Sequence, residues 1–168
     1  PFQAFVSPAN PLPFISAGTL HSVVLNANGT VSAFGTNNLG QTSVPAGLSN
    51  VVAVSAGGYH TLALKSDGTV VGWGGSGGSQ AIVPTGLANV VSISAGGTHS
   101  LALKSDGTVV AWGSNSYGQC NVPAGLTGVV AISAGDNHSV ALKSDGTVVA
   151  WGYYWYNYST PPAGLTDV

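Results

Sequence analysis

The stretch that decides the fold runs from Gly57 to Gly74 and reads GGYHTLALKSDGTVVGWG. Related stretches recur along the chain at a constant interval of 39 residues, which four anchor histidines mark: His21, His60, His99 and His138. A strict period of this length is typical of stacked or radially repeated supersecondary units. The sequence therefore predicts four copies of one unit, and a function that resides where one copy departs from the others.

The repeats account for nearly the whole chain and span 12–50, 51–89, 90–128 and 129–167. We expect a single four-repeat domain over 12–168, preceded by an extended N-terminal arm at 1–11, because 168 residues leave no room for a second domain. The chain opens with Pro1 and not with Met. Two interpretations stay open, a trimmed fragment or a mature chain whose signal peptide has been removed. The location that we expect is extracellular.

Charge is almost absent from this chain. Only 5% of the residues are charged and the net charge is −2, whereas about 25% is usual. Phosphate binding needs clustered Lys or Arg, so nucleic acid is not an expected partner. No apolar run reaches the roughly 18 residues of a membrane helix, so no membrane span is expected. A nearly neutral surface also lacks the repulsion that keeps proteins apart, which favours contact with other copies of the chain or with another extracellular protein.

Three short strands are predicted in each repeat. In the second repeat they cover 51–55, 60–65 and 69–73, which are rich in β-branched and apolar residues and are bounded by turn residues. Asp67 and Gly68 predict a two-residue hairpin turn of the primed type, which needs positive φ and therefore Gly, Asn or Asp. The other repeats carry equivalent tips at Asn28-Gly29, Asp106-Gly107 and Asp145-Gly146.

That turn fixes a predicted register. It places Leu62 opposite Trp73 and Leu64 opposite Val71 on one bulky face, and leaves Ala63 on a nearly flat one. The bulky face of one sheet can then pack on the flat face of the next, and such stacking around an axis gives a propeller. We therefore expect an all-β, β-propeller-type array of four blades, either a closed four-bladed ring or one completed by neighbouring chains. Three tryptophans should lie buried between adjacent sheets: Trp73, Trp112 and Trp151.

Several longer motifs recur with the repeat. They are Ala-Gly-x-x-His-Ser-(Leu/Val)-Ala-Leu-Lys, Gly-Thr-Val-Val-Ala-Trp-Gly, Tyr117-Gly118-Gln119 and Val122-Pro123-Ala124. Over about 12–168 they resemble the repeats of the regulator of chromosome condensation family, and are most similar to the compact bacterial form, as in a secreted propeller protein that inhibits β-lactamases. The resemblance implies a seven-bladed propeller that acts by protein–protein contact, with some members exchanging nucleotide on a small GTPase or binding chromatin.

The four histidines are candidates for a ring of metal ligands, because imidazole is a common zinc ligand. Each one follows a glycine turn and precedes Ser or Thr, a position that suits a ring bridging neighbouring polar groups. We expect a structural role for them, and no metal or other cofactor. The chain has no Glu, and three of its five Asp residues sit in predicted hairpin turns. No catalytic set is visible, so we expect no enzymatic activity.

The fourth repeat departs most from the others, in the loop at 153–158, where five aromatic residues stand in place of mostly small polar ones. Exposed Tyr and Trp side chains give a large contact area at low entropic cost and anchor interfaces. Three interpretations of this loop stay open: a cap or closure of the array, an anchor for another copy or another partner, and a patch on which a sugar stacks. The candidate binding residues are Tyr153, Tyr154, Trp155, Tyr156 and Tyr158 of this loop, with Tyr117 of the third repeat.

These observations together predict a secreted, non-enzymatic structural or adhesive protein that acts by protein–protein contact. Leu12–Ser16 fills the position of Val51–Ser55, and Val168 ends in phase with the repeat. A neighbour's strand added at such an end, head to tail, gives rings or filaments. We expect self-assembly through the chain ends and the aromatic loop. The alternative is a soluble protein-binding propeller of the inhibitor type, or a lectin that binds carbohydrate.

Overall fold

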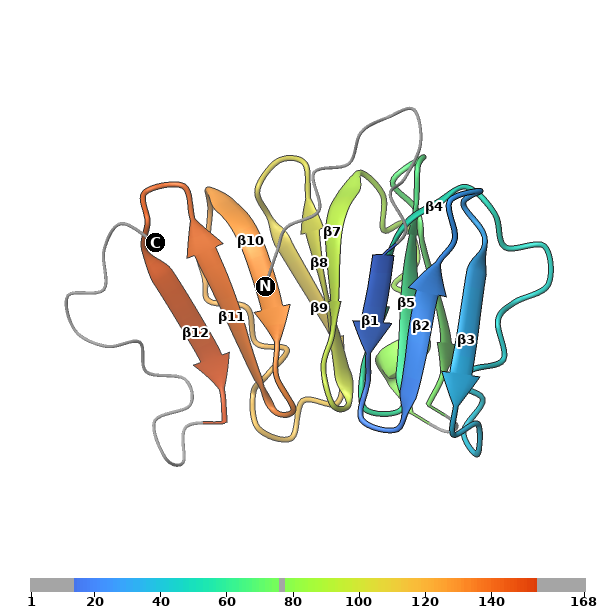
Figure 1. Cartoon of the computed structure of the whole chain (residues 1–168). Helices are drawn as coiled ribbons and strands as arrows, with labels where there is room; N and C mark the ends of the chain where they lie inside the picture. The colour runs from blue at the N-terminus through green and yellow to red at the C-terminus, as the bar shows by residue number, and fades with distance from the viewer. Residues whose placement is uncertain (1–13, 76–77, 154–168) are drawn as a thin grey trace.

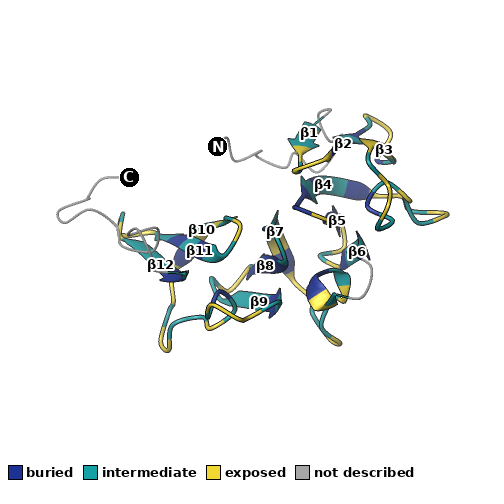
Figure 2. Cartoon of the chain, turned by 90° about the horizontal axis from the view of Figure 1, so that it is seen from below, coloured by how far each residue is buried: buried dark blue, intermediate teal, exposed yellow. Residues whose placement is uncertain are grey.

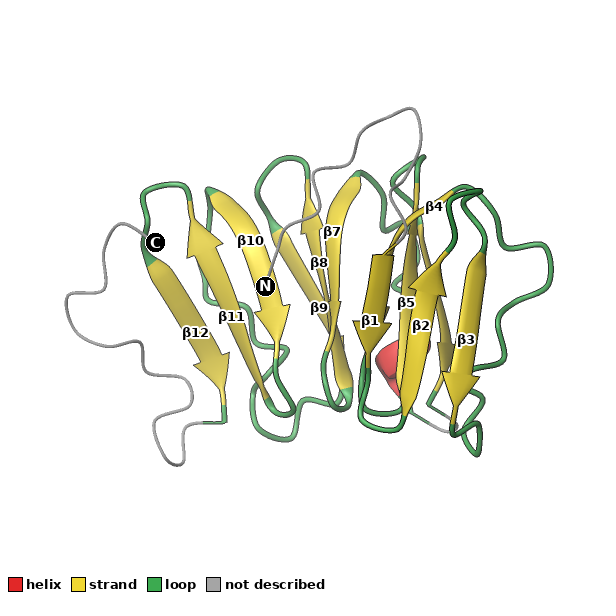
Figure 3. Cartoon of the chain, in the orientation of Figure 1, coloured by secondary structure: helices red, strands yellow, loops and turns green. Residues whose placement is uncertain are grey.

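The computed structural model describes residues 14–75 and 78–153, and in this part of the chain each repeat forms one three-stranded antiparallel sheet (Figures 1 and 3). The predicted all-β fold is confirmed. One turn of 3₁₀ helix, η1 (Ser79–Ala81), follows the second sheet, and no described helix is long and apolar enough to cross a membrane. The strands are β1 (Phe14–Ala17), β2 (His21–Leu25), β3 (Val31–Gly35), β4 (Val51–Ala56), β5 (His60–Lys65), β6 (Val70–Gly74), β7 (Val90–Ala95), β8 (His99–Lys104), β9 (Val109–Gly113), β10 (Val129–Ala134), β11 (His138–Lys143) and β12 (Val148–Gly152).

The four sheets follow an open arc (Figure 2). The first strands of the sheets (β1, β4, β7 and β10) lie along the inner side of the arc and the third strands (β3, β6, β9 and β12) along its outer side. The first and last sheets stand at its two ends. The described residues therefore form an open arc and not the closed four-bladed ring, and completion of the array by neighbouring chains stays a prediction. The predicted N-terminal arm at 1–11 lies outside the described residues.

The hairpin between the second and third strands is one residue longer than predicted. The Lys65 N–H donates to the Thr69 carbonyl at 2.9 Å and the Gly68 N–H donates to the Lys65 carbonyl at 3.0 Å. The loop therefore holds Ser66, Asp67 and Gly68, of which only Gly68 has a positive φ, 77°. This is a type I turn closed by one left-handed residue, which is the common three-residue hairpin loop.

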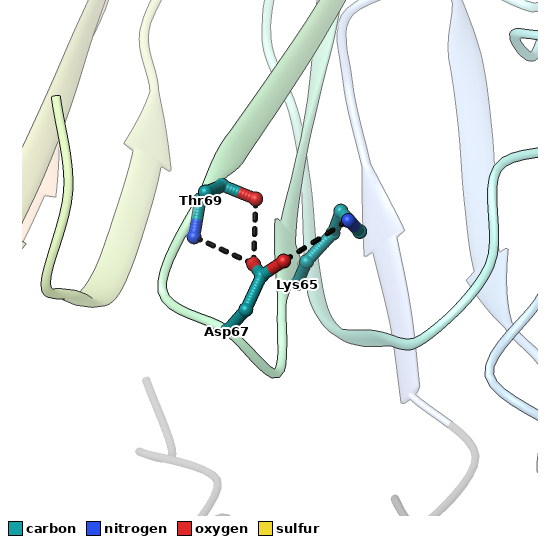
Figure 4. Close-up of polar contacts among 3 residues, drawn as sticks. All are labelled: Lys65, Asp67 and Thr69. Carbon is teal, nitrogen blue, oxygen red and sulfur yellow. Dashed lines mark hydrogen bonds and ion pairs between the residues drawn. The ribbon is translucent and has the colours of Figure 1, made fainter. Parts of the chain in front are cut away.

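The Asp67 carboxylate explains why this turn is preferred (Figure 4). Its Oδ1 accepts hydrogen bonds from the Thr69 backbone N–H at 3.0 Å and from the Thr69 hydroxyl at 2.6 Å, and its Oδ2 pairs with Lys65 Nζ at 3.1 Å. The Thr69 bonds, with help from Lys65, lower the pKa of Asp67 to about 2. Asn28 makes the same two bonds to Thr30 in the first repeat without a charge. The turn thus needs an acceptor at this position, and the ion pair is secondary.

The longer loop makes the predicted register wrong by one residue. Thr61 pairs with Trp73, and Leu62 pairs with Gly72 instead of Trp73. A one-residue shift moves a whole set of side chains to the opposite face of a strand. Each sheet therefore has a leucine face and a tryptophan face. In the second sheet, the leucine face carries Leu62, Leu64 and Val70, and the tryptophan face carries Thr61, Ala63, Val71 and Trp73.

The core consists of three layers in which the leucine face of one sheet packs on the tryptophan face of the next. Leu62 and Leu64 pack with Trp112 and Ala102, and the other two junctions repeat this packing. The predicted burial of the tryptophans is confirmed, since Trp73, Trp112 and Trp151 are each 7% exposed. Hydrophobic contact between unlike faces is thus the main force that orders the sheets.

A polar relay crosses every junction beside this apolar contact. His60 Nε2 on β5 lies 2.8 Å from the Ser100 hydroxyl on β8, which donates to the Gln80 backbone carbonyl at 2.8 Å. All three groups are buried. The same relay recurs as His21–Thr61–Gln41 and as His99–Ser139–Gln119, with every link between 2.8 and 2.9 Å.

The relay fixes the protonation of its histidines. A serine hydroxyl has one proton, which Ser100 gives to the Gln80 carbonyl, so His60 Nε2 must carry a proton and donate to Ser100. The Nδ1 of His60 is buried and has no hydrogen-bond partner among the described residues. Burial, followed by the neighbouring His99 and His21, lowers the pKa of His60 to about 4. Burial likewise lowers the pKa of His99 to about 4. These three histidines bridge adjacent sheets, as expected for a structural role.

The inner edge of the arc needs small residues. A Cβ added at Gly57 would meet the carbonyl oxygen of Gly96 in the next sheet and the ring of His60 in its own. The Ser55 hydroxyl accepts from the Ala95 backbone N–H at 3.0 Å, a contact repeated at each junction. The Ser-Ala-Gly sequence therefore lets neighbouring first strands approach closely.

Removing one buried tryptophan should cost much of the stability. Trp73→Ala should lower the free energy of unfolding by about 3–5 kcal/mol, because it leaves a cavity between two sheets. Urea unfolding in dilute protein, followed by far-UV circular dichroism, measures this. The matched control is Phe34→Ala at the equivalent position of the first sheet, where the side chain is 61% exposed and the cost should be below about 1 kcal/mol. Equal losses would contradict the packing described here.

Acid should destabilise the array between about pH 6.5 and pH 4. Unfolded histidines bind protons near pH 6.5, whereas His60 and His99 stay neutral in the fold down to about pH 4. The unfolded state then binds more protons across this interval, so the free energy of unfolding falls as the pH falls. Asp67 titrates lower, and its contribution is lost only below about pH 4.

The urea midpoint at about pH 7, 5.5 and 4 measures the effect, and the double variant His60→Gln, His99→Gln should flatten the profile. A midpoint of the unmodified chain that is constant, or that rises toward pH 4, would overturn the neutral relay.

Candidate functional site

The candidate site lies between the third and fourth sheets, where the loop after β9 meets the end of β12. Asn115 shapes this loop: its Oδ1 accepts from the Cys120 backbone N–H at 2.8 Å, and its Nδ2 donates to Asn121 Oδ1 at 2.7 Å. Asn37 makes the equivalent bond to the Thr42 N–H in the first repeat, at 2.9 Å. A turn-forming Asn at the start of the loop therefore sets its path.

Gln119 anchors the loop to the fourth sheet. Its side chain is fully buried, and its Oε1 accepts from the Tyr117 backbone N–H at 2.9 Å. Its backbone carbonyl accepts from Ser139 Oγ and from Trp151 Nε1, both at 2.8 Å. One residue thus fixes the backbone below Tyr117 and joins it to β11 and β12.

Two tyrosines meet above this anchor. The Tyr117 and Tyr153 rings contact edge to face, with centroids 4.8 Å apart and planes at 80°. Tyr153 is held by its backbone N–H, which donates to the Asn137 carbonyl at 2.9 Å, while Tyr117 is 47% exposed. The pair borders a shallow hollow, and the lining carries no Asp, Glu, Lys or Arg. The lining residues are Ser116, Tyr117, Gly118, Asn121, Trp151, Gly152 and Tyr153.

The structure thus brings together two of the predicted binding residues, Tyr117 and Tyr153, from different repeats. Their pairing was missed, although a signal existed: the two positions lie 36 residues apart, and the equivalent pairs, Leu39 with Gly75 and Gly78 with Ser114, contain no aromatic residue. Asn121 and Trp151 of the lining were also missed as site residues. The other predicted residues, Tyr154, Trp155, Tyr156 and Tyr158, lie outside the described residues.

The described part of the chain offers little acid–base or metal chemistry. Within 14–75 and 78–153, no group of three His, Cys, Asp or Glu is placed to hold a metal ion. Burial raises the pKa of the Cys120 thiol to about 11, and its Sγ donates to the Ser114 carbonyl at 3.2 Å. Such a thiol is protonated and unreactive at neutral pH. The chemistry that the hollow can offer is aromatic stacking and neutral hydrogen bonding.

The fold is shared with several solved propellers. Yeast RCC1 (Prp20), in its complex with Kap60, matches with a TM-score of 0.74 at 22% identity, over 92% of this chain and 48% of that one. Human WBSCR16 matches at 0.69 and 22%, over 92% and 49%. The ectodomain of the Arabidopsis thaliana receptor kinase ACR4 matches at 0.69 and 21%, over 92% and 54%. The chain thus spans about half the length of these solved chains. At such identity they show the fold alone.

Among curated protein sequences no significant relative is found. The family model for the regulator of chromosome condensation (RCC1) repeat matches four times, at 14–41, 51–80, 90–119 and 129–155. Each match covers one sheet and the start of the loop that follows it, including the relay histidine and, in the first three, the relay glutamine. The matched residues make up more than half of the chain, which therefore belongs to the RCC1 repeat family.

Proposed function

We propose that this chain is a non-enzymatic protein-binding scaffold that works outside the cell in a structural or adhesive role. It binds through the aromatic surface, defined by Tyr117 and Tyr153, and through the two ends of the array, and its expected partners are other copies of itself or another extracellular protein. The observation that carries the proposal is the tyrosine pair beside an uncharged hollow, in which Tyr117 is exposed and Tyr153 is half-buried. Interface centres are depleted in charge and enriched in Tyr and Trp.

Two features of the similar solved structures support this proposal, one for contact with proteins and one for an extracellular role. Prp20 is seen bound to Kap60, and its properties of binding to Gsp1p and histones are described with another structure of it. The receptor-kinase relatives are ectodomains, which supports an extracellular role for this type of propeller. Nucleic acid is not proposed as a partner, because contact with its phosphates needs clustered Lys or Arg, and this chain has only three Lys and no Arg.

A second candidate is carbohydrate binding, which the same hollow favours for a specific reason. Tyr117 presents an exposed ring, and Asn121 lies beside it with amide groups that can bond sugar hydroxyls. A soluble propeller of the inhibitor type, like the secreted bacterial protein that inhibits β-lactamases, would use the same surface on a protein partner. The two candidates differ in the size of the ligand, because a sugar fills the hollow whereas a protein covers its rim.

Replacing the tyrosine pair should weaken self-association. The double variant Tyr117→Ser, Tyr153→Ser should raise the dissociation constant at least about tenfold, which corresponds to the loss of about 1.4 kcal/mol from an aromatic anchor. Sedimentation equilibrium measures this constant, and urea unfolding checks that the fold is intact. Tyr59→Ser is the matched control, since Tyr59 is 41% exposed in the second repeat, away from the hollow. An unchanged constant in the double variant would remove the aromatic surface from the proposal.

Sugar binding has its own readout. Trp151 lines the hollow, so an oligosaccharide that enters it should change the tryptophan fluorescence, and Tyr153→Ser should abolish the change. A panel of neutral oligosaccharides that gives no saturable change at millimolar concentration would dismiss the lectin alternative.

A further inference from the structure

Among residues 14–75 and 78–153, none covers the tryptophan face of the first sheet. Phe34 takes the place of Trp73 in the repeat and is 61% exposed, whereas Trp73 is 7% exposed. Ile15 takes the place of Val54 and is 76% exposed, whereas Val54 is 3% exposed. We call this the start face, and its residues are Ile15, Ser22, Val24, Ser32 and Phe34.

The fourth sheet leaves its leucine face partly uncovered, at the opposite end of the arc (Figure 2). Val140 and Leu142 are half-buried. Their equivalents in the second sheet, Leu62 and Leu64, are 0% and 2% exposed beneath the third sheet. We call Val140 and Leu142, with Ser133 of β10, the end face.

The two faces carry opposite halves of one interface. At each of the three internal junctions a leucine face covers a tryptophan face, with the cluster of leucine and valine on one side and the tryptophan and alanine on the other. The end face supplies the first half and the start face supplies the second. Neither face contains Asp, Glu, Lys or Arg, so no charged group opposes their contact.

The residue types that make the polar contacts of a junction recur at the corresponding positions of the two ends. Each internal junction joins a histidine Nε2 to a hydroxyl 40 residues later, as in His60 with Ser100. Across the two ends, His138 holds the histidine position and Ser22 holds the hydroxyl position. Each junction also joins a serine hydroxyl to a backbone N–H, as in Ser55 with Ala95. Ser133 and Ala17 hold these positions at the two ends, and Ser133 is exposed.

We propose that the end face of one copy docks on the start face of a second copy and builds a further junction of the type already present three times within the chain. This inference rests on the proposed self-assembly and names the surfaces that carry it. The contact is head to tail. The arc is open (Figure 2), so the proposed assembly is a closed pair in which both pairs of ends are joined. The partner is a second copy because its end face carries the kind of apolar side chains that pack on the tryptophan face at each internal junction.

The experiment compares the solution mass of the unmodified chain with that of two face variants, Phe34→Asp and Leu142→Asp. The unmodified chain should sediment at twice the chain mass of 16.6 kDa. Each variant alone should sediment as a single chain, because every head-to-tail contact then contains one altered face. An equimolar mixture of the two variants should regain a two-chain species, since one of its contacts joins two unaltered faces. Ile82→Asp, at a residue that is 69% exposed outside both faces, should remain paired.

Circular dichroism and urea unfolding check that each variant folds, and Val140→Asn replaces Leu142→Asp if that variant does not. A single-chain mass for the unmodified chain at the highest soluble concentration overturns the proposal. Pairing that survives in both variants overturns it as well. Loss of pairing in only one variant, with no rescue in the mixture, indicates a symmetric contact of one face with itself and also overturns it.

The same measurement separates this inference from the proposed function. If the face variants stay paired while the Tyr117→Ser, Tyr153→Ser variant becomes single, the aromatic surface stands and face docking is wrong. If the face variants separate while the tyrosine variant stays paired, face docking stands and the aromatic contact is not its source.

Discussion

The array depends on one backbone carbonyl at each junction. The carbonyls of Gln41 and Gln119 each accept two hydrogen bonds from the next sheet, one from a hydroxyl and one from a tryptophan indole. The hydroxyl in turn holds the histidine of the preceding sheet, so one acceptor ties a loop, a histidine and a tryptophan together. A buried polar group costs free energy unless it is paired, and this arrangement pairs three donors in a small volume. The leucine and tryptophan faces can then close over these three donors, and the histidine Nδ1 atoms are the buried groups of the relay that stay without a partner among the described residues.

The second junction holds together although its glutamine carbonyl does not bond the tryptophan. The Gln80 carbonyl still accepts from Ser100, but Trp112 Nε1 has no partner among the described residues. The segment before Gln80 lacks the Asn that begins the loop in the first and third repeats, and Gln80 itself lies in η1. An unpaired buried donor costs about 1–3 kcal/mol. The packing of Trp112 against Leu62 and Leu64 is therefore sufficient to hold the sheet in place without the indole bond.

Repetition and departure have separate roles in this molecule. The relay recurs at each of the three described junctions, and the inner glycines and hairpin turns recur in each sheet, because they build the repeated fold. Among the described junctions, the tyrosine pair occurs at one, where Tyr117 and Tyr153 replace small or aliphatic residues. The ends depart in another way, because the residues follow the repeat while their surroundings do not: Phe34 and Ile15 are core residues by position and surface residues by exposure. Binding is proposed at these places because they present aromatic and apolar area that the repeat itself does not require.

The sequence by itself determined the period, the three strands of each blade, the burial of the tryptophans and the structural placement of the histidines. These follow from local signals, namely β-branched runs, glycine turns and the spacing of apolar residues. It did not determine the register, because Asp67-Gly68 suits either a two-residue or a three-residue loop, and the choice rests on the Lys65–Thr69 pairing and the bonds from Asp67 to Thr69.

Tertiary structure also decided the site and the ends. Tyr117 and Tyr153 belong to different repeats, and only the packing of the loop on the fourth sheet, through Gln119, brings their rings into contact. The two uncovered faces likewise depend on the course of the arc, since a period specifies what each blade contacts but not whether the last blade reaches the first. That outcome depends on the rotation between sheets, which is set by all the contacts of a junction together and is not encoded in the spacing of residues.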